Sequence, residues 1–445
     1  MARVADEVPL TLEGAPPKTL GVLDQGALWA NLGVSLLGFS GALFLLDPLG
    51  NAPLSLAAAL MAALVGSLVG TAMVGLSAVP GTRTGQPAMV LLRGLFGAKI
   101  SYVPTVLNVV QMLGWGAFEL WVIAKAATAI FGGIPYQVWV LVAGVLTTVL
   151  TIWPLGAIRL LRRYVTAGVI LSMIWFAWFF LNEAPTHGGG TWTAFPAAVD
   201  YVIALSVSWV PMAADFARHS RSGRAAFTGV VGGYTLAQVA CLGLGVYAVA
   251  IAGSAAVTAD STAVFAPFVA VPAGALFFGI LVLRESDQSF ANVYSTTVSL
   301  QNLMPRVDRR VLSGAIGLLI TAIALVVDVT SYGAFLGVIG AVFVPMFAVL
   351  AVDYFLFARS WDTSESAPSR WNMLVPWALG FAAYWLTTST PTLPAWDAFW
   401  AGTRAAIGFA RQPWMNGALG AALVAALVTL AVGLLTGRSW RAVRR

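Results

Sequence analysis

The sequence predicts an all-α polytopic membrane protein with twelve transmembrane helices. Of its 445 residues, 59% are hydrophobic and only 9% are charged, whereas a soluble domain carries roughly 25% charged residues. Each crossing of a bilayer needs ~20 apolar residues, so the composition allows at most about 13 spans. This composition excludes a soluble enzyme, a disordered chain and a nucleic-acid-binding module.

The sequence also limits the chemistry that side chains can supply. A single cysteine, Cys241, excludes an internal disulfide framework and a cysteine-based metal cluster. Two histidines leave little for zinc, and no nucleophile motif or phosphate-binding loop stands in the chain. We therefore expect neither an enzyme nor a bound cofactor.

Twelve apolar segments are separated by short polar stretches, with boundaries that are uncertain by several residues. They lie near residues 27–47, 53–79, 103–130, 135–155, 164–182, 195–217, 226–253, 266–299, 311–329, 331–357, 372–388 and 414–436.

The basic residues predict how these segments cross the membrane. Lys and Arg accumulate in short loops on the cytoplasmic side. If the N-terminus is inside, most of the 24 basic residues fall in inside loops, and only the last outside loop holds any, Arg404 and Arg411. We expect a multi-pass protein of a bacterial inner membrane with both termini cytoplasmic. Residues 1–26 form a tail without a cleavable signal, and residues 437–445 form a basic tail.

The first and sixth segments contain small and polar residues where a lipid-facing helix would be uniformly apolar. The first carries Asn31, Ser35 and several glycines, and the sixth carries Ser206, Ser208 and a proline. Interrupted helices at corresponding places in two halves are typical of transporters built from inverted repeats. We expect repeats over 27–182 and 195–357, followed by two more spans over 372–436.

The third segment places Gln111, Trp115 and Glu119 at i, i+4 spacing on one helix face. An indole with a carboxylate one turn away can stack a flat ring and hydrogen-bond its edge. A packed Trp with a structural Glu is an equally good interpretation of this pattern alone.

The eighth segment has three charges in four residues, Arg284, Glu285 and Asp287. Ionisable groups inside a span usually face a cavity or a partner. Arg284 and Asp287 at i, i+3 can form an ion pair. Alternatively, Ser286, Asp287 and Asn292 offer oxygen-bearing groups suited to Na⁺ or a proton.

Several motifs, spread in order along the chain, resemble those of the nucleobase–cation symporter-1 family of cytosine, purine, allantoin and hydantoin permeases. The more specific are the Gly-Thr-Arg-Thr-Gly loop at 81–85 and the Ala-Asp-Phe helix end at 214–216. The resemblance is carried by residues 28–31, 81–93 with 96–97, 114–119, 214–218, 290–295 and 351–355.

The resemblance implies a LeuT-like fold of five plus five helices with two extra C-terminal helices, alternating access, and coupling to Na⁺ or H⁺. It implies that Trp115 stacks the substrate ring and that Glu119 and Asn292 bond its edge. The sixth-span position that is often aromatic in the family is Ser206 here, and Trp209 is a possible substitute. The remaining candidates for substrate contact are Gln111, Ser208, Gln288 and Ser35, and those implied for sodium are Asn31, Val34, Leu283, Ser286 and Asp287.

Glu119 stands where the family often has an amide, and an ionised carboxylate only accepts hydrogen bonds. This favours an amino-bearing ring, such as cytosine, an aminopurine or the aminopyrimidine precursor of thiamine, over uracil; a protonated Glu119 could also donate. The predicted function is cation-coupled import of a planar nitrogenous ring. The alternative is a LeuT-like symporter for an amino acid or amine. The expected partners are the substrate, Na⁺ or H⁺ and the lipid bilayer, with no nucleic acid and no required oligomer.

Overall fold

The computed structural model describes residues 17–49, 52–152, 156–183, 185, 189–253, 261–304, 306–327, 332–357 and 361–437, with the backbone alone for 156–165, 261 and 287. The described residues form helices and no strand. Two isolated bridges, Leu20 to Ser220 and Leu54 to Thr191, join separate loops.

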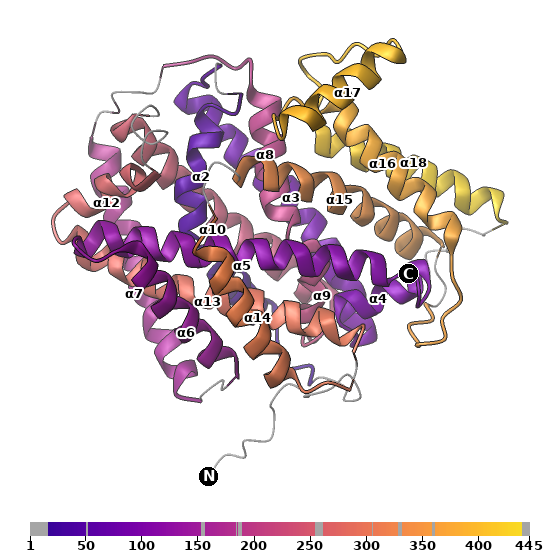
Figure 1. Ribbon diagram of the computed structural model, residues 1–445, viewed down its shortest axis with the longest axis horizontal. Helices are drawn as coiled ribbons and strands as arrows, with labels where there is room; N and C mark the ends of the chain where they lie inside the picture. The colour runs from indigo at the N-terminus through magenta and orange to yellow at the C-terminus, as the bar shows by residue number, and fades with distance from the viewer. Residues whose placement is uncertain are drawn as a thin grey trace.

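The helices follow one another in the order of the predicted segments (Figure 1). The first half contains α1 (Val22–Gly33), α2 (Leu36–Leu46), α3 (Leu56–Thr84), α4 (Ala88–Phe96), α5 (Tyr102–Phe131), α6 (Tyr136–Ile152) and α7 (Gly156–Asn182). The second half contains α8 (Phe195–Val207), η1 (Val210–Met212), α9 (Ala213–Ala217), α10 (Gly223–Ala252), η2 (Ser261–Phe265), α12 (Ala266–Ala270), α13 (Gly274–Gln301), α14 (Arg309–Ala324), α15 (Tyr332–Val352) and the π-helical turn η4 (Asp353–Phe357). The chain ends with η5 (Trp371–Met373), α16 (Leu374–Thr387), α17 (Pro394–Ala406) and α18 (Gly417–Leu435), which are grouped at one side of the molecule.

A helix lies at each of the twelve predicted segments. Within the described residues, six helices are long and apolar enough to cross a membrane, or seven if the bent pair of α1 and α2 is one span. The multi-pass helical character is thus confirmed, and the count of twelve crossings stays a prediction. Two helices were not predicted, α4 and α17, because each is too short to give an apolar segment of its own.

The break in the first predicted span is confirmed. Helices α1 and α2 are bent by 63° with respect to each other. Val34 ends α1 in an extended conformation, and the Ser35 hydroxyl accepts a 3.1 Å hydrogen bond from the backbone N–H of Leu37 at the start of α2. The sixth segment is also interrupted, by a turn at Ser208 and Trp209 and the short 3-10 helix η1.

Small residues allow the inner helices to pack closely, as is common in membranes. A Cβ atom at Gly229 of α10 would lie 2.5 Å from Gln25 of α1. One at Gly70 of α3 would lie 2.5 Å from Ser206 of α8. The first contact joins α1 to α10, and the second joins α3 to α8. The two interrupted segments meet at the rings of Trp29 and Trp209, whose centroids lie 5.7 Å apart.

The two more specific sequence motifs meet in space. The Gly-Thr-Arg-Thr-Gly motif is the last turn of α3, capped by Gly85, and not the loop expected from the sequence. Its Thr82 hydroxyl donates a 2.8 Å hydrogen bond to the carbonyl of Ala217. The backbone N–H of Ala88, at the start of α4, donates a 2.8 Å hydrogen bond to the Asp215 carboxylate. Because a helix N-terminus favours an acidic group, this contact stabilises α4 against α9.

Candidate functional site

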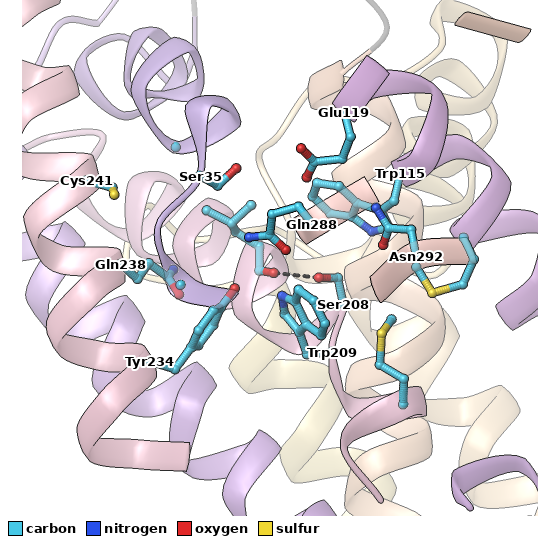
Figure 2. A pocket seen from close by; sticks show the side chains of 15 residues that line it. Ser35, Trp115, Glu119, Ser208, Trp209, Tyr234, Gln238, Cys241, Gln288 and Asn292 are labelled. Atoms are coloured by element: carbon cyan, nitrogen blue, oxygen red, sulfur yellow. Dashed lines mark hydrogen bonds between the residues drawn. The ribbon is translucent and has the colours of Figure 1, made fainter. Parts of the chain in front are cut away.

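A pocket of about 30 Å³ lies at the break of α1 and α2 and is closed by α5, the segment from α8 to η1, α10 and α13. Figure 2 shows polar side chains from these helices converging on it. The pocket is lined by Gly33, Ser35, Gly38, Met112, Trp115, Glu119, Leu205, Ser208, Trp209, Met212, Tyr234, Gln238, Cys241, Gln288 and Asn292.

The wall formed by α5 carries the predicted face of the third span. Gln111, Trp115 and Glu119 are all buried, and Trp115 and Glu119 line the pocket. Gln111 does not line it, since its amide donates to Asn108 at 2.9 Å and to the carbonyl of Ser208 at 3.1 Å. Gln111 therefore joins α5 to the interrupted sixth segment, behind the pocket wall.

The aromatic surroundings of Trp115 determine how its ring stands. The rings of Tyr332 and Phe335 of α15 lie edge-on to it, at centroid distances of 5.9 Å and 5.4 Å. Edge-to-face contacts of this kind fix the plane of an indole. Trp115 thus meets the pocket in a defined orientation.

The wall formed by α13 carries a polar stripe. Arg284, Gln288 and Asn292 follow one another at i, i+4 spacing, and each is at most 3% exposed. Gln288 and Asn292 line the pocket. Leu283 lies on another face of the helix and is 66% exposed. With Ser286 it lines an apolar groove between α5, α6 and α13.

The break of α1 is bonded to the polar stripe of α13. The Gln288 amide donates to the carbonyls of Leu32 and Val34. The Arg284 Nε donates to the Asn31 side-chain oxygen at 3.3 Å. The Ser35 hydroxyl donates to the Glu285 carboxylate at 2.9 Å.

The residues that the family resemblance implies as sodium ligands therefore lie in two separate places. Asn31 and Val34 stand at the break and contact Arg284 and Gln288, whereas Leu283 and Ser286 line the outer groove. The side chain of Asp287 lies outside the described residues. Within the part of the chain that the structure describes, no three His, Cys, Asp or Glu side chains form a group that could hold a metal ion.

The interrupted sixth segment and α10 form the remaining wall. Ser208 and Trp209 line the pocket, and the Trp209 ring stands edge-on to Trp29 at 5.7 Å and to Tyr234 at 6.1 Å. Ser206 does not line the pocket, because it lies behind this wall and donates a 2.9 Å hydrogen bond to Gln238.

Three pocket residues of α10 were missed by sequence reasoning, namely Tyr234, Gln238 and Cys241. Tyr234 and Gln238 stand one turn apart on the same face of a mostly apolar helix, and this i, i+4 spacing is the sequence pattern that could have indicated them. It was overlooked because the seventh segment has no interruption and no charge.

Several polar atoms of the site have no hydrogen-bond partner in the part of the chain that the structure describes. Those beside the pocket are Trp115 Nε1, Glu119 Oε2, Gln288 Oε1 and, behind the wall, Gln111 Oε1. Those at the break of α1 are Arg284 Nη1, Arg284 Nη2 and Glu285 Oε2. Buried polar groups are nearly always hydrogen-bonded. A donor on α5 and acceptors on α5 and α13 are thus available to a ligand in the pocket.

These features define the class of protein. A polytopic helical membrane protein with a broken first span beside a central polar pocket has the construction of a secondary transporter. The chain belongs to the nucleobase–cation symporter-1 family, since residues 49–367 match the family described as permeases for cytosine and purines, uracil, thiamine and allantoin.

Solved structures share the fold. The inward-facing conformation of Mhp1 matches with a TM-score of 0.70 at 16% identity, over 99% of this chain and 96% of Mhp1. A closed conformation of Mhp1, a nucleobase-cation-symport-1 family transporter, with bromovinylhydantoin bound gives a TM-score of 0.70 at 17% identity, over 97% and 96%. A Na⁺-coupled sialic acid symporter gives 0.62 at 11% identity, over 96% and 92%. No curated protein sequence matches. The predicted LeuT-like fold is confirmed.

Proposed function

We propose that this protein is a secondary symporter that imports a planar nitrogenous ring by alternating access, driven by a cation. The proposal includes twelve spans with both termini cytoplasmic, and inverted repeats over 27–182 and 195–357. Family membership supports a permease for heterocycles. The substrates that we favour are cytosine, an aminopurine or an aminopyrimidine such as the precursor of thiamine.

One observation carries this proposal. The unpartnered atoms Trp115 Nε1, Glu119 Oε2 and Gln288 Oε1 belong to side chains that line the same pocket. The two acceptors, Glu119 Oε2 and Gln288 Oε1, suit N–H groups at the edge of a ring that stacks on the face of Trp115. An amino group on the ring would satisfy Glu119 in its ionised form.

The pocket needs an opening step. A volume of about 30 Å³ holds about two water molecules, at ~15 Å³ each. A ring is larger, so its entry requires the helices around the break of α1 to separate. Rigid-body motion of one helix bundle against another supplies such an opening in alternating access.

The contacts of Trp115 and Trp209 support stacking as the second source of affinity. Both indoles line the pocket, and both are held by edge-on neighbours. A planar ring stacks on a face that is already oriented, and this reduces the entropy lost on binding. Trp209 takes the place of an aromatic residue at position 206.

Isothermal titration of the purified protein with single compounds tests this function. The compounds are cytosine, uracil, adenine, guanine, hypoxanthine, allantoin, a hydantoin, aminopyrimidines and, as the competing class, amino acids and simple amines. We expect saturable binding of at least one amino-bearing ring. Saturable binding of an amino acid or amine, with no response to any ring, would contradict the proposed substrate class. The chain would then share the fold of the family but not its substrates.

A further inference from the structure

Helix α13 closes the break between α1 and α2 with three side chains of its own, Arg284, Glu285 and Gln288, which we call the α13 clamp. Its four hydrogen bonds reach Asn31, Leu32, Val34 and Ser35, which are consecutive in the chain except for Gly33. Each clamp residue is at most 3% exposed. The break is thus held by protein groups over its whole length.

The carbonyl groups released by the break already have a donor. A helix C-terminus leaves its last carbonyls without intrahelical partners. At the end of α1, the Gln288 amide donates to the carbonyls of Leu32 and Val34. The family resemblance implies that the carbonyl of Val34 coordinates sodium. In this structure the same carbonyl accepts a hydrogen bond from the neutral amide of Gln288.

A positive charge is also already present. The Arg284 guanidinium is 1% exposed, donates to Asn31 and lies 3.8 Å from the Glu285 carboxylate. The C-terminal end of a helix attracts a cation through its dipole, and an arginine keeps its charge at any physiological pH. Arg284 supplies that charge without an ion from solution.

The hydroxyl expected to complete a sodium site stands elsewhere. Ser286 and Leu283 line the apolar groove between α5, α6 and α13. A rotation of about 100° per residue separates neighbouring positions on a helix. The α13 face toward the break therefore presents 284, 285 and 288 in place of 283 and 286.

We propose that Arg284 is a resident cation at the α1 break, and that the conformation of this break does not depend on sodium. This inference rests on the proposed function and restricts it, because the cation that drives symport would then not be Na⁺. Arg284 acts as a positioning residue, which holds α1 against α13 beside the substrate pocket.

The single cysteine of the chain gives a substrate-free test. Cys241 is buried and lines the pocket next to the break, so a small maleimide reaches its thiol only when the pocket opens. The alkylation rate is measured on the full-length protein in NaCl and in KCl at equal ionic strength and fixed pH. We expect equal rates for the wild type. A rate that changes more than about twofold between the two salts, as expected if sodium locks the break, would overturn the proposal.

Substitutions at position 284 test the charge itself. Arg284→Lys keeps the charge, and we expect the wild-type rate within a few-fold. Arg284→Gln removes it, and we expect opening to be faster by roughly tenfold or more, because losing one partner of a buried charge pair is strongly destabilising. Arg224→Gln, at an exposed position of α10, is the matched control and should leave the rate unchanged. An unchanged rate in Arg284→Gln would contradict the proposal.

If Arg284→Gln does not fold, the salt comparison in the wild type and in Arg284→Lys still decides the question. The same assay separates the two proposals. Protection of Cys241 by a planar ring tests the proposed function, whereas the salt comparison uses no substrate. A sodium effect with ring protection would remove only this inference, and a sodium-independent rate without ring protection would remove only the proposed substrate.

Discussion

Asn108 of α5 donates a 2.7 Å hydrogen bond from its side-chain amide to the hydroxyl of Ser299 on α13. This buried bond sets the register of two helices that run in opposite directions. With Asn108 beside Ser299, Trp115 stands across from Asn292, and Glu119 stands across from Gln288; these last four side chains line the pocket. The register thus creates the polar walls of the pocket.

Asn108→Ala should weaken the contact between α5 and α13. Leaving a buried partner unsatisfied costs about 1–3 kcal/mol, so we expect a lower midpoint of thermal unfolding in detergent. Asn182→Ala, where the native amide is exposed and bonds within its own helix, should have little effect. Equal midpoints for the two variants would contradict the register argument.

Trp115→Ala should weaken binding of the best ring by roughly 5- to 150-fold, since stacking of a base on an aromatic side chain contributes ~1–3 kcal/mol. Trp115→Phe should keep most of the affinity because a planar face remains. Titration calorimetry measures both. The control is Trp178→Ala, at a site 68% exposed in α7, and the stacking role fails if this variant loses as much affinity as Trp115→Ala.

Glu119→Gln should change which rings bind more than it changes stability. An amide can both donate and accept, whereas an ionised carboxylate only accepts. We expect the ratio of cytosine affinity to uracil affinity to fall by about tenfold, equivalent to ~1.4 kcal/mol. Competition binding against one labelled ring gives this ratio directly. If the wild type binds uracil tightly and Glu119→Gln does not change that affinity, Glu119 does not select amino-bearing rings over uracil.

The ion pair of Asp353 and Arg370 should stabilise the end of η4 without contributing to substrate binding. Their closest atoms lie 2.6 Å apart, and Asp353 also accepts a 3.0 Å hydrogen bond from the Trp361 indole. Asp353→Asn should therefore cost about 3 kcal/mol of stability, read as a lower midpoint of thermal unfolding. Asp362→Asn, at an exposed position, should leave the midpoint unchanged, and ring affinity should be preserved in both variants.

The sequence predicted the parts of the site that depend on local pattern. The spacing of Trp115 and Glu119 gave one face of α5, and the small and polar residues around Ser35 gave the break of α1. Tyr234 and Gln238 were missed because their role depends on α10 packing against α1, which is a tertiary contact.

The face of α13 could not be predicted for a related reason. Neighbouring residues on a helix point about 100° apart. The four consecutive polar residues 284–287 therefore allow more than one face of α13 to point toward the break. Only packing against α1 and α5 selects the one in which Arg284 and Gln288 face the break. The short helices α4 and α17 depend on tertiary contacts in the same way.

The most direct test of the central claim is uptake by the protein reconstituted into proteoliposomes. Labelled rings and labelled amino acids or amines are compared under an inward gradient of protons, of sodium or of both. The account predicts saturable, gradient-driven uptake of an amino-bearing planar ring, and Trp115→Ala should raise the ring concentration needed for half-maximal uptake. Saturable uptake of an amino acid or amine, with no uptake of any ring, would contradict it.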